Sequence, residues 1–568
     1  EGWIEYYGSF EEMFQYFCDN TTIHGTIRLN CSRKNKMKTA FWLVIFFLSF
    51  AMMYWQFGIM VTQYWSYPIS TTVTVQSKGN KFPAVTICNL NPFRFDQVNT
   101  YLNQLDKLAQ ETLYSLYNYD GLKAKQQVIH LQDFLHNVTN QFNGSFILDQ
   151  SIVLQKLQEN GSGPALPGEK TFQVGFKLCN SSGGDCYYKS YWSGVDALHE
   201  WYQFHYINIM SKIPPVLNIS GDELGKNFIF SCDFIQKPCT LREYKFFHHP
   251  IYGSCFTVTP QGKENALYSP RAGKKYGLSL KVKVDQKHNM PLLSQAAGAR
   301  IMIHNPNQPP LVEHQGFDIR PGTETSIGVK QDEVRHLGGK YGPCASDGNN
   351  LGLKLLYSTS YTLQACLNSC FQYKMTETCG CGYYFYPLPP GTEYCNYNKH
   401  PGWGHCFYQL YEKMLDHRHH CFTQCPMQCT KTRYQLSAGT AQWPSPTSKT
   451  WIIPLLTRHK GYNGTSKRSD ILKINVYYEE LSYQSVEETP AMPVTLLLSN
   501  MGGQWSWWFG SSVLSVVEIA ELVFDTVAMA ILMTYRWKKQ RAPQYGGRNN
   551  WNSTSTCQFS PKCRFCSH

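Results

Sequence analysis

The sequence predicts an α+β membrane protein in which two transmembrane helices bracket a large, disulfide-rich ectodomain with a β-rich core and peripheral helices. Three observations lead to this fold class. The 568-residue chain has two long stretches without charged side chains, at 39–77 and 489–517. The region between them holds most of the 21 cysteines, and basic residues gather outside it. Apolar stretches of this length are typical of membrane spans, and dense cysteines are typical of an oxidising compartment.

The first apolar stretch predicts a transmembrane helix over residues 39–64, after a cytosolic segment at 1–38. Its densest part, Thr39–Val61, is 23 residues long, and roughly 20 apolar residues suffice to cross a bilayer. No cleavable signal peptide is recognised, so this span is expected to direct insertion. A buried helix of a soluble protein is the alternative. Tryptophans flank the span, as expected of rings at the headgroup level: Trp42, Trp55 and Trp65.

Basic residues predict the orientation, because cytosolic segments next to membrane spans carry an excess of Lys and Arg. They precede the first span and follow the second, in a tail at 536–568, so both termini are expected in the cytosol, and the plasma membrane is the expected location. The net charge of +12 is partly this pattern, and it gives no support for nucleic-acid binding. The residues concerned are Arg28, Arg33, Lys34, Lys36, Lys38, Arg536, Lys538, Lys539, Arg541, Arg548, Lys562 and Arg564.

Residues 65–504 are predicted to form the extracellular domain. Five cysteines lie outside it (Cys18, Cys31, Cys557, Cys563 and Cys566) and 16 remain inside, an even count that suggests eight disulfides. N-glycosylation sequons agree with this placement, because acceptor sites are used only on the lumenal side. They begin at Asn137, Asn143, Asn160, Asn180, Asn218 and Asn463.

Periodicity predicts several elements of this domain. Strand patterns open it at 72–76 and 82–88, with 473–478 as their possible partner before the second span. Further strands are expected at 278–284, 299–304 and 325–330. Helical patterns occur at 97–117, 195–213 and 363–373.

Cysteine spacing predicts a disulfide ladder. Cys366 and Cys370 are four residues apart, as are Cys421, Cys425 and Cys429, so each set is expected on one helix face. Two antiparallel segments would then be joined as Cys370 with Cys421 and Cys366 with Cys425. The alternative is a zinc site, suggested by Cys379, Cys381, His417, His419 and His420. The oxidising compartment and the even count favour disulfides.

The second span is predicted at 505–535, and it carries three acids: Glu518, Glu521 and Asp525. At 100° per residue their offsets place them within about 60° of one another on a helix. Carboxylates are costly in lipid and almost always face water or protein, so this stripe indicates a cation pathway. Tryptophans also flank this span: Trp505, Trp507, Trp508 and Trp537.

Small residues stand just before these acids, at Gly510, Ser511 and Ser512. Such residues let backbones approach a central axis, and their carbonyls and hydroxyls can replace the water shell of a cation. Ordinary helix packing is the alternative explanation. The acids on the same predicted helix favour a selectivity filter.

The chain closely resembles the epithelial sodium channel and degenerin family over nearly its whole length. The resemblance depends on His24-Gly25, on 82–89 (Phe-Pro-Ala-Val-Thr-Ile-Cys-Asn), on the cysteine framework and on the Gly/Ser-x-Ser pattern at 510–512. Within the family the alpha and delta types fit better than beta or gamma. Residues 185–188, 204–206 and 403–406 favour that group, while 178–181 and 382–384 lean toward delta.

The resemblance implies roles for individual residues. Gly510, Ser511 and Ser512 are the expected filter for sodium and lithium. Ser506 is the expected amiloride contact at the pore mouth, Gly503 a gate position, and His24 with Gly25 a gating motif. The resemblance also implies eight disulfides: Cys88–Cys255, Cys179–Cys186, Cys232–Cys239, Cys344–Cys429, Cys366–Cys425, Cys370–Cys421, Cys379–Cys406 and Cys381–Cys395.

The expected function is therefore that of a pore-forming subunit of a trimeric, amiloride-sensitive, sodium-selective epithelial channel, apical in epithelia, with beta and gamma partners. Sodium and lithium would pass without a cofactor and without any metal beyond the permeating ion. The alternative is a ligand-gated cation channel of the purinergic or acid-sensing kind. An ectoenzyme is not expected, because the sequence has no Gly-x-Ser-x-Gly, His-Glu-x-x-His or phosphate-loop motif. An adhesion receptor would have no reason to keep three acids in a span.

Overall fold

The computed structural model describes residues 7–26, 28, 35–77, 80–91, 95–118, 149, 151–166, 171–212, 228–239, 244–259, 268–284, 286, 289–346, 348, 352–416, 421–459, 467–510 and 512–540. The chain divides into two compact units, which are described separately. The helical unit comprises Glu1–Ser70 and Thr489–His568, and the sheet unit comprises Thr71–Glu488.

Four helices form the described part of the helical unit: α1 (Phe10–Asn20), α3 (Lys36–Trp65), α13 (Val494–Phe509) and α14 (Val513–Gln540). Among the described residues, α3 alone is both long and apolar enough to cross a membrane. Asn35 caps its first turn by accepting a hydrogen bond from the Lys38 N–H. The helix begins and ends close to the expected bounds of 39–64.

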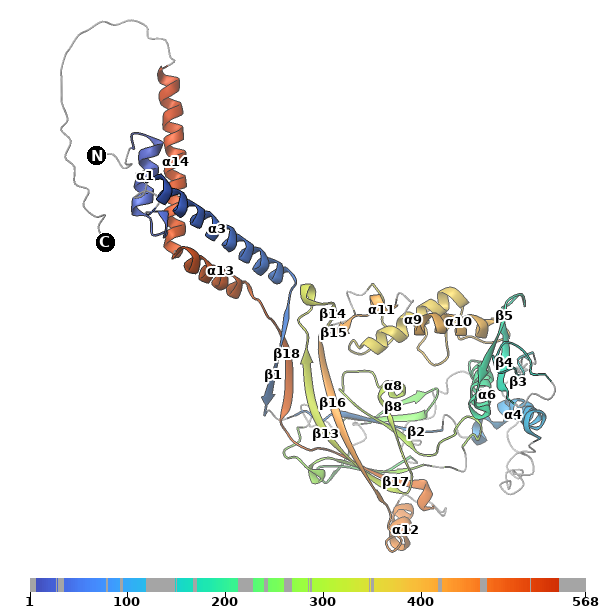
Figure 1. The fold of residues 1–568 in the computed structure, drawn as a ribbon. Helices are drawn as coiled ribbons and strands as arrows, with labels where there is room; N and C mark the ends of the chain where they lie inside the picture. Colours follow the sequence, from blue (N-terminus) through green and yellow to red (C-terminus); the bar gives the residue numbers. More distant parts are fainter. Residues whose placement is uncertain are drawn as a thin grey trace, which may run out of the picture. The chain divides into compact units, whose positions relative to one another are not determined.

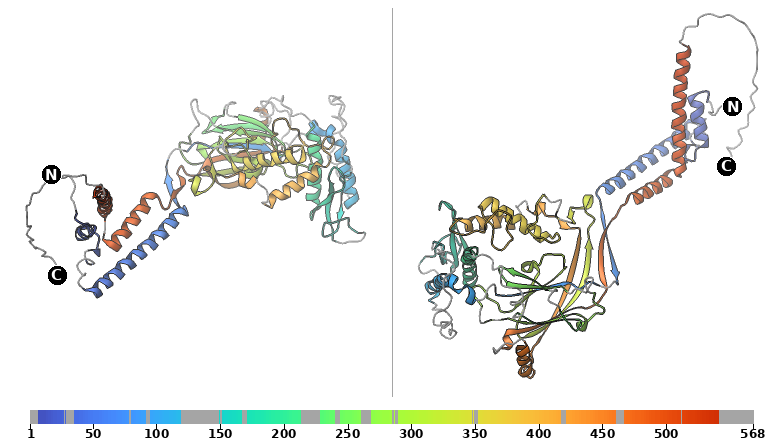
Figure 2. Two further views of the ribbon diagram at one scale, coloured as in Figure 1. Left: turned by 90° about the horizontal axis from the view of Figure 1, so that it is seen from above. Right: turned by 180° about the vertical axis from the view of Figure 1, so that it is seen from behind.

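The single helix expected at 505–535 is instead two helices that meet at an angle, as Figures 1 and 2 show. The first begins eleven residues earlier than expected, at Val494, and ends at Phe509. Gly510 follows in the left-handed conformation with φ of 60°, and its N–H donates to the Ser506 carbonyl at 2.8 Å. Glycine reaches this conformation at no steric cost and is a common helix terminator. The second helix starts at Val513.

The sheet unit has an eight-stranded and a five-stranded sheet. The larger has the order β1-β18-β13-β17-β10-β6-β7, with β16 also paired to β13, and the smaller has the order β12-β11-β2-β9-β8. Apolar side chains of both sheets form one core, for example Val85 and Ile87 of β2 with Leu280 of β10 and Ile474 of β17. The strands are β1 (Ile69–Gln76), β2 (Ala84–Asn89), β6 (Ile229–Phe234), β7 (Lys237–Pro238), β8 (Tyr244–His249), β9 (Gly253–Val258), β10 (Leu278–Lys283), β11 (Ala299–His304), β12 (Phe317–Ile319), β13 (Thr323–Arg335), β16 (Thr430–Gln442), β17 (Ile471–Tyr478) and β18 (Tyr483–Pro490).

The strand partners differ from the sequence expectation. The strand β17 was expected to pair with the strands that open the domain. It pairs instead with β10 and β13, while β1 pairs with β18 and β2 with β9 and β11. The two opening strands therefore belong to different sheets.

Helices and a small sheet form a second core of the sheet unit. Figures 1 and 2 show α4, α6, α9 and α10 at one side of this unit, near β3, β4 and β5. Large aromatic side chains fill this core, among them Trp201, Phe204 and Trp403. The elements are α4 (Phe95–Tyr117), α6 (Gly194–Met210), α9 (Leu363–Cys379), α10 (Trp403–Leu415), β3 (Leu154–Leu157), β4 (Gln173–Cys179) and β5 (Cys186–Tyr191).

The remaining elements are short: α8 (Val312–Gln315), α11 (Cys421–Gln424), α12 (Lys449–His459), β14 (Cys344–Ala345), β15 (Met427–Gln428) and the 3₁₀ turns Lys274–Tyr276, Gly339–Tyr341 and Arg468–Asp470.

Eight disulfides are present among the described residues, and they are the eight pairs that the family resemblance implies. The two rungs derived from spacing, Cys366–Cys425 and Cys370–Cys421, are among them. The expectation of a second long cysteine-bearing helix was wrong, because α11 ends at Gln424 and leaves Cys425 and Cys429 outside it. Disulfides also occupy Cys379 and Cys381, so their sulfurs are not thiolate ligands for zinc. His417, His419 and His420 lie outside the described residues.

Candidate functional site

The break between α13 and α14 lies at the predicted filter. Gly510 and Ser512 flank it, and Ser511 lies outside the described residues. The Ser512 hydroxyl accepts a hydrogen bond from the Leu514 N–H at 3.2 Å, and the Ser512 N–H donates to the Ser515 Oγ at 3.2 Å. The first turn of α14 is thus capped by serines, as the exposed N–H groups of a helix start require.

The N-terminal segment Thr21–Gly25 lies against this break. The His24 N–H donates to the Phe509 carbonyl at 2.9 Å, and the His24 ring occupies the space where a side chain on Gly510 would lie. The Thr22 hydroxyl is 2.6 Å from the Ser515 hydroxyl, which is completely buried. The expected gating motif and the expected filter, far apart in sequence, are therefore in direct contact.

All three predicted pore acids lie on α14, and Glu518 differs from the other two. Its Oε2 atom accepts hydrogen bonds from the Thr21 hydroxyl at 2.8 Å and from the Thr22 N–H at 3.0 Å. Glu521 is exposed and Asp525 is half-buried. The sequence predicts that all three carboxylates face a hydrated pathway. In the structure one carboxylate oxygen of Glu518 also ties the N-terminal segment to α14.

The predicted pore-mouth residue Ser506 and the predicted gate residue Gly503 lie on α13. Ser506 is exposed, and its carbonyl receives the Gly510 N–H. Gly503 is exposed one turn earlier, and a Cβ added there would meet no atom within 4 Å. Both positions are therefore accessible in the single chain, and Gly503 has room for a larger side chain.

Aromatic side chains of α3 hold the end of α13. Phe509 is 3% exposed, and its ring lies 5.5 Å, centroid to centroid, from each of the rings of Phe46 and Phe50. One turn back, the ring of Trp505 lies 6.3 Å, centroid to centroid, from the ring of Phe57. The last residue before the break is thus fixed by its neighbours in the same unit.

Comparison with known proteins gives the family. A family described as the amiloride-sensitive sodium channel matches residues 17–522. The chain belongs to this family. It is similar to the epithelial sodium channel subunit alpha of Xenopus laevis, with 45% identity over 95% of this chain and 86% of that protein. It is also similar to the human alpha subunit, with 43% identity over 100% of this chain and 86% of that protein.

Family membership decides between several expectations. As a member of this family, the chain is a membrane protein with a disulfide-rich, mixed α/β ectodomain, and it is not an enzyme. The relatives named above are alpha subunits, so they agree with an alpha-type chain and do not support the leaning toward delta. The sodium-channel interpretation is favoured over the alternative of a ligand-gated cation channel of the purinergic or acid-sensing kind.

The predicted glycosylation sites are only partly described. Asn160 is exposed in a turn, where its Oδ1 accepts from the Ser162 N–H and hydroxyl, and Asn180 accepts from the Asp185 N–H at 3.3 Å. Asn137, Asn143, Asn218 and Asn463 lie outside the described residues.

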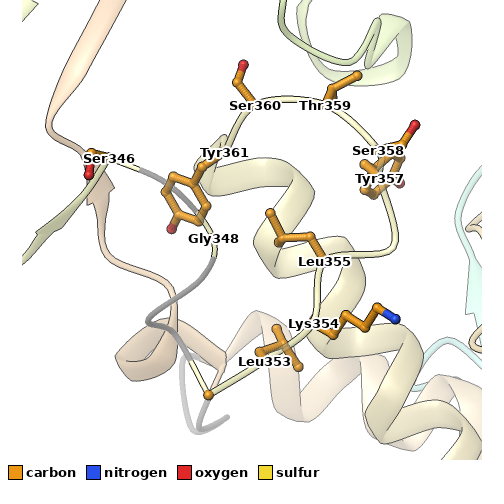
Figure 3. Close-up of a pocket in the computed structure, with 11 residues that line it drawn as sticks. Ser346, Gly348, Leu353, Lys354, Leu355, Tyr357, Ser358, Thr359, Ser360 and Tyr361 are labelled. Carbon is orange, nitrogen blue, oxygen red and sulfur yellow. The ribbon is translucent and has the colours of Figure 1, made fainter.

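A cavity lies elsewhere, in the sheet unit. It has a volume of about 590 Å³ and is lined by the loop before α9, including Leu353, Leu355 and Tyr361 (Figure 3). None of the predicted site residues lines it.

Sequence reasoning missed four residues that hold the break: Thr21, Thr22, Phe509 and Ser515. Their partners are more than 490 residues away in the case of both threonines, and no local pattern reports such a contact. The one available signal was position, since Thr21 and Thr22 precede His24-Gly25 and Ser515 opens the acid-bearing stretch.

Proposed function

We propose that this chain is a pore-forming subunit of a trimeric, amiloride-sensitive, sodium-selective channel that conducts Na⁺ and Li⁺ passively across the plasma membrane. One observation carries the proposal. In a chain of this family, the first helix after the ectodomain ends at Phe509 with Gly510 as its cap, and the acid-bearing helix α14 begins at Val513.

The break suits a filter because it exposes backbone. A continuous helix uses its own carbonyls in hydrogen bonds, whereas a break leaves carbonyl and hydroxyl oxygens near Gly510 and Ser512 that can replace water around a cation. Glu521 and Asp525 would keep the potential below the filter negative and concentrate cations. The membrane potential supplies roughly 2.3 kcal/mol per charge per 100 mV, so transport needs no chemical energy source.

Assembly with other subunits follows from the number of spans. The helix α3 and the α13–α14 pair would give each chain two spans, which cannot enclose a selective pore alone. We take beta and gamma subunits as the partners, because the related proteins are alpha subunits. The basic residues outside both spans support cytosolic termini, and the family resemblance supports an apical location.

The contact between the N-terminal segment and the break supports a gating role for His24 and Gly25. Movement of this segment would shift the Phe509 carbonyl and the residues after it, because the His24 N–H holds that carbonyl. Ser506 and Gly503 are proposed as the amiloride contact and the gate position, and their exposure on α13 supports both roles.

Voltage clamp of the chain, alone and with beta and gamma subunits, tests the proposal. We expect a constitutive inward Na⁺ current that amiloride blocks, a similar Li⁺ current and little K⁺ current. Ser512→Cys should change the ion preference, while Ser499→Cys, at an exposed position of α13, should not. An ATP-evoked current, or an unchanged ion preference in Ser512→Cys, would contradict the proposal.

A further inference from the structure

A hydrogen bond joins α3 to α13 within the apolar part of the helical unit. The indole Nε1–H of Trp508 donates to the side-chain oxygen of Gln56 at 3.0 Å. Gln56 lies inside the uncharged stretch 39–77. A side-chain amide in a membrane span is costly unless its polar atoms are paired, and such residues usually face a neighbouring helix.

The bonded residue adjoins the break. Trp508 is followed by Phe509, whose ring packs against Phe46 and Phe50 of α3, and then by Gly510, where the helix ends. Apolar contacts fix how closely two helices approach, but they have little directional preference. A hydrogen bond is directional, so Gln56 restricts the rotation of α13 about its own axis.

We infer that Gln56 is a positioning residue for ion selectivity: through Trp508 it fixes the rotation of α13 and hence the direction of the carbonyls of Phe509 and Gly510, at the end of this helix. This inference rests on the proposed function of the break as a filter. The adjacent Trp507 gives the contrast, because its side chain is 81% exposed. Of these two neighbouring tryptophans, Trp508 is the one that donates a hydrogen bond to α3.

The test is a double-mutant cycle in the full chain expressed with beta and gamma subunits. Gln56→Leu removes the acceptor at similar size, and Trp508→Phe removes the donor but keeps an aromatic ring. Matched controls are Gln63→Leu on α3 and Trp507→Phe on α13, both at exposed positions. The measurements are the Na⁺/K⁺ permeability ratio from reversal potentials and surface expression by biotinylation.

We expect Gln56→Leu and Trp508→Phe each to lower the permeability ratio about fivefold, the factor that corresponds to one interhelical hydrogen bond of about 1 kcal/mol. The double variant should lower it no further, because both changes remove the same bond. The permeability ratios of the two controls should stay within about twofold of the ratio of the unmodified channel.

Different outcomes separate the two proposals. An unmodified chain without sodium current would contradict the proposed function itself. A conducting channel whose ratio is unchanged in Gln56→Leu, or whose double variant shows the product of the single effects, would overturn the role of Gln56. If Gln56→Leu fails to reach the surface, Trp508→Phe against Trp507→Phe decides, and equal ratios in that pair would overturn the inference.

Discussion

At the scale of single residues, Gly510 occupies a position that glycine alone fills without cost. Its φ of 60° is left-handed, and a Cβ there would overlap the imidazole ring of His24. Left-handed backbone costs other residues roughly 1–2 kcal/mol before any steric overlap. Both the helix end and the contact with the N-terminal segment therefore depend on the missing side chain.

We predict that Gly510→Ala abolishes or strongly reduces sodium current at equal surface expression. Gly502→Ala is the matched control on the same helix: a Cβ at Gly502 meets no atom within 4 Å, and alanine favours a helix interior by roughly 1 kcal/mol. Two-electrode recording with biotinylation measures both variants. Equal currents from the two would contradict the role of Gly510.

Glu518 combines two tasks that substitution can separate. Its Oε2 holds Thr21 and Thr22, and its charge adds to the acidic stripe on α14. Glutamine at this position would keep an acceptor oxygen without the charge, whereas alanine would remove both. We predict that Glu518→Gln keeps gating but lowers single-channel conductance, and that Glu518→Ala also changes open probability.

Single-channel recording of Glu518→Gln, Glu518→Ala and Thr22→Val measures these effects. Thr22→Val removes the threonine hydroxyl but keeps the N–H that donates to Glu518, so it should change open probability only. A conductance unchanged in Glu518→Gln would show that this carboxylate does not influence the permeating ions.

At the scale of elements, local patterns predicted individual helices and strands well but not their partners. The helix patterns at 97–117 and 363–373 correspond to α4 and α9, and the strand at 299–304 is β11. Periodicity depends only on neighbouring residues, whereas pairing depends on which distant strand is adjacent. The sequence therefore could not show that β1 pairs with β18 or that β2 belongs to the smaller sheet.

In the candidate site, too, local patterns predicted the individual segments but not their contacts with distant residues. Apolar length and the three acids located the second hydrophobic stretch, and the small residues at 510–512 located its break. A glycine in an apolar stretch is compatible with a continuous helix as well, so the stretch was expected as one helix. The contact of His24 with Phe509 depends on the tertiary fold, and only the structure shows it.

The disulfide ladder gives a prediction at this scale. Cys366–Cys425 and Cys370–Cys421 span 59 and 51 residues, but each rung lies only four residues from the other on both segments. With one rung in place, the other closes a loop of about eight residues, worth roughly 2–3 kcal/mol of unfolding free energy. When neither rung is present, the first rung to form must close a much longer loop, so its loss costs more unfolding free energy. We predict that removing both costs about 6 kcal/mol, about 1 kcal/mol more than the sum of the single losses.

Denaturant unfolding of the solubilised full chain, followed by tryptophan fluorescence, measures these losses for serine variants of each pair. The control is Cys179–Cys186, which closes a loop of seven residues and should cost about 2 kcal/mol independently of the ladder. Strictly additive losses from the two rungs would contradict the loop argument.

At the scale of the whole molecule, buried histidines make the stability of the sheet unit depend on pH. His205 on α6 is completely buried, and burial lowers its pKa to about 4 although a hydrogen bond to the Ile152 carbonyl opposes the shift. Burial likewise lowers the pKa of His304 on β11 to about 4. Both side chains are neutral in the folded protein at neutral pH.

The sign of the effect follows from proton binding. An unfolded histidine has a pKa of about 6.5, so between pH 6.5 and 4 the unfolded chain binds more protons than the folded chain. The contribution of these two neutral histidines to the free energy of unfolding is therefore complete above about pH 6.5. It falls as the pH drops and levels off near pH 4. Each of the two histidines contributes a loss of about 3 kcal/mol over this range.

We predict that the thermal midpoint of the solubilised chain falls between pH 6.5 and 4, and that His205→Gln makes this fall shallower. The Tyr397 hydroxyl lies 3.0 Å from the His205 Nδ1 atom, on the side of the ring away from the Ile152 carbonyl. Glutamine keeps a donor and an acceptor near these two groups but does not ionise. The matched control is His199→Gln on the same helix, where the histidine is only half-buried. In this variant the slope of the thermal midpoint against pH should stay as in the unmodified chain. Thermal melts across this pH range measure the slope for all three chains. A slope that is the same in His205→Gln and in the unmodified chain would mean that His205 takes up its proton without unfolding, and burial in the aromatic core would then not control the acid stability of this unit.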